Sequence, residues 1–171
     1  MRKLVLAASI AATPLVAAPA AQAHVTLNPR TAVAGSFARL DVRVPNERDD
    51  AATRTVVVNF PDGFYSVSYK RVWGWTAKVT MAKLSTPVKT GEGTVTERVA
   101  KIAWRATAKR YRIAPGQFEE FGLSAQVPNT PGATLTFPST QTYDSGEVVR
   151  WTGPAGADTP APTVSVVAAA S

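Results

Sequence analysis

The residue best suited to chemistry in this sequence is its single histidine, His24. It follows Ala21-Gln22-Ala23, a small-x-small pattern typical of a signal-peptidase site, behind a positively charged start at Arg2 and Lys3 and an apolar run. Cleavage after Ala23 would make His24 the first residue of the mature chain. Its α-amine and ring Nδ1 could then close a six-membered chelate ring on a metal ion, and Cu(II) favours such nitrogen donors.

The rest of the composition limits the chemistry that the chain can perform. The 171 residues contain no cysteine, which excludes disulfides, thiolate metal sites and a cysteine nucleophile. One histidine excludes any mechanism that needs two imidazoles in this chain, and an imidazole at the terminus is not expected in a Ser-His-Asp hydrolase. We therefore predict that the protein is not an enzyme. The fractions of apolar (45%) and charged (18%) residues are those of a folded domain.

A carboxylate is needed to complete a copper site around His24, because neutral oxygen donors alone hold a divalent cation weakly. Glu47 is the best candidate, since it follows an alternating segment over residues 40–44 where the chain emerges at one pole of the expected fold. From spacing alone, a solvated turn residue beside Arg48 and Asp49 is the more favoured interpretation of Glu47. Five further carboxylates could supply an outer ligand, although a surface position is their default: Asp41, Glu119, Glu120, Asp144 and Glu147.

The elements that would position these residues show an apolar period of two rather than 3.6. Residues 40–44 and 75–81 alternate between apolar and polar types, and residues 55–60 form a largely β-branched run. Glycine, proline and aspartate turns separate these from further runs at 94–104, 121–127, 133–137 and 148–151. Seven to nine short strands at this spacing predict an all-β protein, an antiparallel β-sandwich.

The chain divides into three expected segments. Residues 1–23 are predicted to be a signal peptide, residues 24–152 the sandwich domain, and residues 153–171 a flexible tail rich in proline and alanine. A signal peptide implies export, to the periplasm or to the outside of the cell envelope. The last nine residues are too few to cross a bilayer core of about 30 Å, so no membrane span is expected in the mature chain as given.

The net charge gives little support for a nucleic-acid partner. Removing Arg2 and Lys3 leaves 17 basic residues against 12 acidic ones, a net charge of +5. The sequence has no basic helix and no aromatic ribonucleoprotein motif, so we expect no nucleic-acid binding. The one basic cluster, Lys109-Arg110-Tyr111-Arg112, is interpreted as a solvated strand or turn face.

Several motifs together resemble the YcnI family, the domain of unknown function 1775. They cover nearly all of residues 24–152, in order: residues 23–29 (AHVTLNP), 40–47 (LDVRVPNE), 73–75 (WGW), 113–118 (IAPGQF) and 146–151 (GEVVRW). The resemblance implies an immunoglobulin-like or cupredoxin-like sandwich that binds Cu(II) through a single-histidine brace. It implies His24 and Glu47 as the metal ligands, and it places Trp151 beside the metal, where the indole would shield the site from water.

The resemblance leads to a hypothesis with two alternatives. We predict an exported Cu(II)-binding protein for copper delivery, storage or detoxification, whose partners would be the copper ion and a chaperone or transporter of the envelope. One alternative is a copper-dependent oxidase or polysaccharide oxygenase, against which the missing second histidine argues. The other is a metal-free carbohydrate-binding or adhesion sandwich that uses Trp73 and Trp75, whose sugar binding would survive His24→Ala. The family more often has Pro-Gly-Trp where this chain has Trp73-Gly74-Trp75, and a core or sandwich-edge role is favoured for Trp73.

Overall fold

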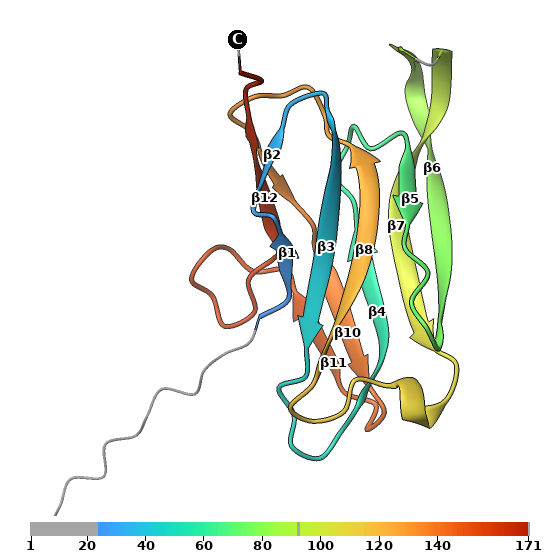
Figure 1. Cartoon of the computed structure of the whole chain (residues 1–171), viewed down its shortest axis with the longest axis vertical. Coiled ribbons are helices and arrows are strands. Elements are labelled where there is room, and N and C mark those ends of the chain that lie inside the picture. The colour runs from blue at the N-terminus through green and yellow to red at the C-terminus, as the bar shows by residue number, and fades with distance from the viewer. Residues whose placement is uncertain (1–23, 92, 171) are drawn as a thin grey trace, which may run out of the picture.

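A computed structural model describes residues 24–91 and 93–170 and has an all-β fold with three sheets (Figure 1). The first sheet has the order β1-β3-β8-β5, with strands Thr26–Asn28, Phe37–Pro45, Phe118–Gln126 and Val67–Tyr69. The second has the order β11-β10-β4-β7-β6, with strands Val148–Trp151, Ser139–Tyr143, Thr53–Asn59, Gly93–Ala106 and Trp75–Thr90. The third has the order β2-β12-β9, with strands Thr31–Val33, Thr163–Val167 and Thr134–Thr136. A short 3-10 helix, η1 (Lys109–Tyr111), connects β7 to β8.

The predicted sandwich is confirmed, and the alternating pattern explains its core. In β3 the apolar residues Leu40, Val42 and Val44 are fully buried, while the residues between them are only partly so. The first two sheets pack face to face through aromatic rings: Trp104 of β7 lies 5.0 Å from Phe121 of β8, centroid to centroid. Burying such rings supplies much of the stability of a two-layer fold. The residues that the structure describes form twelve strands rather than seven to nine, because several strands have only three residues and give no periodic signal.

The C-terminal prediction needs correction. Residues 153–171 were expected to be a flexible tail outside the sandwich, but residues Thr163–Val167 form β12, which pairs with β2 in parallel and with β9 antiparallel. Val164 and Val166 are buried in the core on alternate positions of this strand. This strand forms because its two valines, at alternate positions, are buried in the core and because β2 and β9 offer strand edges on its two sides. These interactions stabilise β12 although a proline-rich segment precedes it. The domain therefore extends beyond residue 152.

The register of β1 against β3 determines where His24 lies. Thr26 pairs with Arg43 and Leu27 with Val42 in an antiparallel ladder. Continued by two residues, this register places His24 opposite Pro45, the last residue of β3. Both residues lie at the same end of the sandwich, where β1 begins, β3 ends and β11 passes behind them (Figure 1). In the described part of the chain, no helix is long and apolar enough to cross a membrane.

Candidate metal centre

His24 lies directly before β1, partly buried against the end of the second sheet. Its imidazole faces the indole of Trp151, the last residue of β11, with ring centroids 5.6 Å apart and an interplanar angle of 56°. Trp151 is almost fully buried. The structure therefore brings together two of the three residues that the sequence predicted for the site.

The indole of Trp151 is oriented by a buried hydrogen-bond network centred on Gln141 of β10. Trp151 Nε1 donates to Gln141 Oε1 at 3.1 Å, and Gln141 Nε2 donates to the carbonyl oxygen of Pro45 at 2.9 Å and to Thr53 Oγ1 at 2.7 Å. Gln141 is fully buried, as is Thr53. One side chain thus links the ring beside His24 to the end of β3, which is opposite His24 in the ladder. Because Trp151 Nε1 is already engaged, the indole can shield a metal but does not offer it this nitrogen.

Glu47 follows two residues after Pro45, in a loop that is fixed by its neighbour Asn46. The buried Asn46 Nδ2 donates to the carbonyl oxygens of Ala51 at 2.7 Å and Ile113 at 2.9 Å, and Asn46 Oδ1 accepts the backbone N–H of Arg48 at 2.8 Å. Glu47 is partly buried, and its Oε1 is buried without a hydrogen-bond partner. A buried carboxylate oxygen without a partner is costly, and a cation would supply what this one lacks.

Tyr143 of β10 lies beside Glu47 and brings a phenol group to the same loop. Its ring is fully buried under the guanidinium of Arg48, whose Cζ lies 5.2 Å from the ring centroid. Burial raises the pKa of the Tyr143 hydroxyl, and the charge of Arg48 opposes this shift. Hydrogen bonds with the Glu47 backbone and the Thr53 side chain also oppose the shift, so the Tyr143 hydroxyl lies against the backbone of Glu47.

Of the five further candidate carboxylates, Asp41, Glu119, Asp144 and Glu147 have hydrogen-bond or ion-pair partners, and Glu120 lies at a different pocket. Arg48 binds Glu147 with two hydrogen bonds, and Arg112 contacts Asp144 at 2.8 Å. Asp41 pairs with Arg39 at 3.0 Å. Glu119 Oε1 accepts the backbone N–H of Glu120 at 2.9 Å, and both residues line a different pocket. Of the carboxylates in residues 24–91 and 93–170, only Glu47 has a buried oxygen without a partner.

The ion pairs around the loop predict how stability depends on pH. The hydrogen bond from Arg48 lowers the pKa of Glu147 below 4.5, and the Ala52 backbone N–H, followed by Arg112, lowers that of Asp144 below 3.8. A carboxyl whose pKa is lower in the folded state adds stability above its unfolded pKa and loses it as the pH falls. We expect the melting temperature to fall between pH 5 and pH 3, and to fall less in the double variant Asp144→Asn, Glu147→Gln. Since both pairs are partly exposed, each contributes at most about 1 kcal/mol. Calorimetry over this pH range tests this, and identical slopes would contradict it.

The donor set available here fits a Cu(II) ion. Among the described residues there is no group of three His, Cys, Asp or Glu side chains that could hold a metal. The His24 nitrogens and the Glu47 carboxylate are donors of the kind that suits a tetragonal Cu(II) site. The predicted signal peptide and its cleavage site lie outside the described residues.

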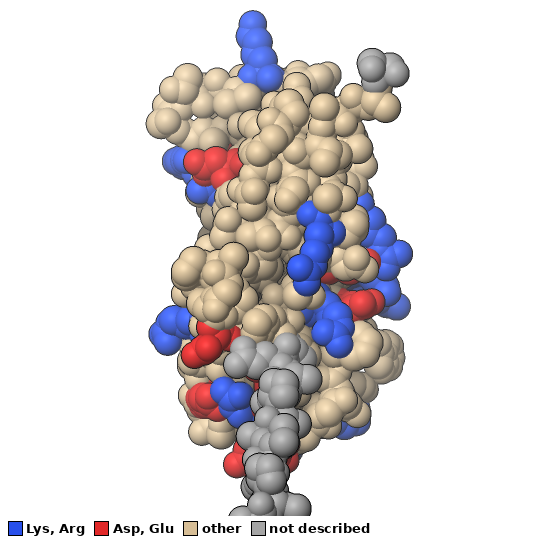
Figure 2. Space-filling model, turned by 90° about the vertical axis from the view of Figure 1, so that its left-hand side faces the viewer, with Lys and Arg blue, Asp and Glu red and all other residues tan. Residues whose placement is uncertain are grey.

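A cavity of about 450 Å³ opens beside His24. It is lined by β1, by β9 and by the loop that connects β11 to β12. On the side of the molecule that carries this loop, Lys and Arg are scattered and interspersed with Asp and Glu rather than gathered in one patch (Figure 2). The visible described surface on this side therefore has no large patch of one charge.

The sequence did not predict Gln141 and Tyr143 as residues of the site. The available signal was the composition of β10, in which the inward positions Ser139, Gln141 and Tyr143 all carry polar groups and are all buried. A strand whose buried face is polar indicates a site rather than a simple core.

Several known proteins are similar to this chain in sequence, in fold or in both. The copper-binding protein CutI of Bacillus subtilis (strain 168) is 29% identical to this chain over 149 residues, which are 87% of this chain; the chain spans 65% of that relative. An uncharacterized protein from Nocardia farcinica with an immunoglobulin-like fold is 30% identical, with a TM-score of 0.67 over 84% of this chain and 98% of that one. A cohesin module from a Clostridium perfringens family 33 glycoside hydrolase shares the fold alone, with 7% identity and a TM-score of 0.52 over 85% of this chain and 97% of the module.

A protein-family model also matches most of this chain. The model of the domain of unknown function DUF1775 matches residues 24–166, which begin at His24 and end within β12. This range contains the copper-site candidates His24, Glu47 and Trp151. The protein thus belongs to the DUF1775 family, the YcnI-like group that its sequence motifs resemble.

Proposed function

We propose that this protein is an exported Cu(II)-binding protein that holds copper at its mature N-terminus for delivery, storage or detoxification in the cell envelope. The ligands are the α-amine of His24, its ring Nδ1 and the carboxylate of Glu47. Trp151 covers the site and limits the access of water. The role is binding rather than catalysis, and a chaperone or transporter of the envelope gives or receives the metal. The relative named a copper-binding protein supports this metal.

The proposal rests on Glu47 Oε1, which is buried and has no hydrogen-bond partner. Glu47 lies two residues after Pro45, the residue opposite His24 when the β1–β3 ladder is continued. A cation placed between this carboxylate and the imidazole would remove the cost of the buried charge. The absence of cysteine and the nitrogen–oxygen donor set favour Cu(II) over Cu(I). Reduction would therefore weaken binding and release the ion to an acceptor with softer ligands.

The proposal is tested by Cu(II) titration, with calorimetry and EPR, of the chain that begins at His24 and of the same chain with one added N-terminal Met. The added residue moves the amine away from the imidazole and breaks the chelate ring. We expect one Cu(II) per chain in the first protein and an affinity lower by about 100-fold or more in the second, with a changed nitrogen hyperfine pattern.

His24→Ala in the chain without the added residue is the matched control, because it keeps a free amine and removes only the imidazole. It is expected to lose the high-affinity site as well. Equal affinity and an equal EPR spectrum with and without the added Met would overturn the brace.

A further inference from the structure

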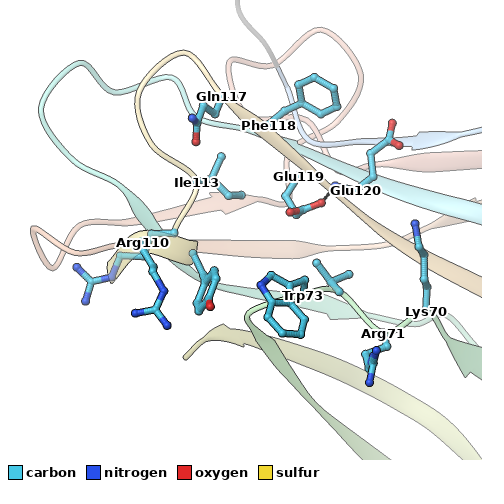
Figure 3. A pocket seen from close by; sticks show the side chains of 12 residues that line it. Lys70, Arg71, Trp73, Arg110, Ile113, Gln117, Phe118, Glu119 and Glu120 are labelled. Carbon is cyan, nitrogen blue, oxygen red and sulfur yellow. Dashed lines mark hydrogen bonds between the residues drawn. The ribbon is translucent and has the colours of Figure 1, made fainter. Parts of the chain in front are cut away.

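Two motifs that the copper site does not use converge on one pocket of about 550 Å³ (Figure 3). One wall carries Trp73, from the connection between β5 and β6, with Lys70 and Arg71 before it. The other motif, the basic cluster at residues 109–112, forms η1 and lies beside Trp73. The start of β8 closes the pocket with Phe118, Glu119 and Glu120.

The fold presents Trp73 to solvent at the tip of a turn. Trp75 N–H donates to the Val72 carbonyl at 3.1 Å, and Gly74 between them has φ +76°, which is the positive value that a type II turn requires at its third position. Tyr111 packs so closely against Gly74 that a Cβ there would clash with its ring. Trp73 meets Tyr111 edge to face, with centroids 6.3 Å apart, yet stays 76% exposed.

This exposure separates Trp73 from the other tryptophans and corrects an expectation. Trp75, Trp104 and Trp151 are all buried, so Trp73 and Trp75 do not form a paired platform. The core or edge role favoured for Trp73 from the sequence is not what the structure has. A large exposed indole, held by a glycine turn on a packed tyrosine, is typical of a surface that binds a ligand with an apolar face.

The pocket carries both positively and negatively charged side chains, and this mixture favours some classes of ligand over others. Within the part of the chain that the structure describes, Lys70, Arg71 and Arg110 form no ion pair, and the Arg110 guanidinium lies 4.5 Å from the centroid of the Tyr111 ring. Glu119 points across the pocket toward Trp73 in Figure 3. This carboxylate would repel a densely charged polyphosphate, but it can accept hydrogen bonds from hydroxyl groups.

We propose that this pocket binds an acidic saccharide chain, with one carboxylate group per sugar ring. The apolar face of a ring stacks on Trp73, its hydroxyl groups donate to Glu119, and its carboxylate contacts Arg110, Arg71 or Lys70. This site is additional to the proposed copper function. Its residues come from the β5–β6 turn, η1 and β8, and none of them is a proposed copper ligand.

The experiment uses the chain from His24 to Ser171 and calorimetry with three probes. Oligogalacturonate carries both rings and charge, a neutral cello-oligosaccharide carries rings only, and polyglutamate carries charge only. We expect oligogalacturonate to bind, the neutral chain to bind about tenfold more weakly, and polyglutamate not to bind. Binding of polyglutamate as strong as that of oligogalacturonate, or no binding of oligogalacturonate, would refute the site.

Matched variants locate the binding. Trp73→Ala is expected to lower the affinity for oligogalacturonate by about tenfold or more, and Arg110→Ala by about fivefold at low salt. Phe37→Ala removes an aromatic side chain that is 57% exposed at the opposite end of β3, and Lys89→Ala removes a lysine of β6; neither should change binding. His24→Ala should retain saccharide binding while losing copper, which separates the two proposals. Full affinity in Trp73→Ala would overturn this one.

Discussion

Replacing Glu47 with Gln is expected to lower the Cu(II) affinity about 100-fold without destabilising the metal-free protein. The substitution keeps the shape of the side chain but removes the negative charge from the proposed third ligand, and a neutral amide oxygen is a weaker donor to a divalent cation. In the metal-free protein Glu47 Oε1 is buried without a partner, so loss of the charge removes a cost. The melting temperature without copper should therefore stay equal or rise. Competition titration with a Cu(II) chelator and calorimetry measure the two quantities.

Glu147→Gln is the matched control for Glu47→Gln. It neutralises another carboxylate of the same pole, which forms the ion pair with Arg48 at 2.6 Å but has no unpaired buried oxygen. A general effect of negative charge near the site would weaken copper binding in both variants to a similar extent. A ligand role predicts a large loss for Glu47 and less than about a threefold loss for Glu147. An unchanged affinity in Glu47→Gln would exclude Glu47 as a ligand.

Among the strands that position the site, β3 could be predicted from the sequence because it is long and alternates cleanly. β3 contains three apolar residues at every second position, and its end marks the position of Glu47. β12 could not be predicted in the same way, since its five residues follow a proline-rich loop and contain only two buried valines. A short strand gains its stability from the edges it pairs with, here β2 and β9, and these edges are set by the tertiary structure.

The candidate site was predictable only where a motif pointed to it. His24 stood out as the one histidine, and the family resemblance raised Glu47 above the alternative of a solvated turn. The role of Gln141 depends on three partners that are 10, 88 and 96 residues away in the chain, so no local pattern reveals it. The exposure of Trp73 likewise depends on contact with Tyr111, which is distant in the sequence.

Replacing Gln141 with Leu is expected to destabilise the fold and to weaken copper binding together. The leucine has a similar volume but leaves Trp151 Nε1, the Pro45 carbonyl and Thr53 Oγ1 without their buried partner. Because each unsatisfied buried group costs about 1–3 kcal/mol, the loss of stability should be about 3 kcal/mol or more. For a chain of this size that corresponds to a fall in melting temperature of about 10 °C. Thermal unfolding of the metal-free protein measures it.

The Cu(II) affinity of Gln141→Leu shows whether Gln141 positions the copper site or only stabilises the fold. Gln141 holds both the indole that faces His24 and the end of β3 that precedes Glu47, so its loss should lower the Cu(II) affinity by about tenfold even at a temperature where the variant is fully folded. Gln126→Leu is the control, because the side chain of Gln126 donates only to the Gly35 carbonyl oxygen, at 3.2 Å, at the far end of β8. It should cost less stability and leave copper affinity unchanged. If Gln141→Leu melted earlier but bound copper as tightly as the unmodified chain, Gln141 would support the sandwich alone, and the orientation of Trp151 would have no part in holding the metal.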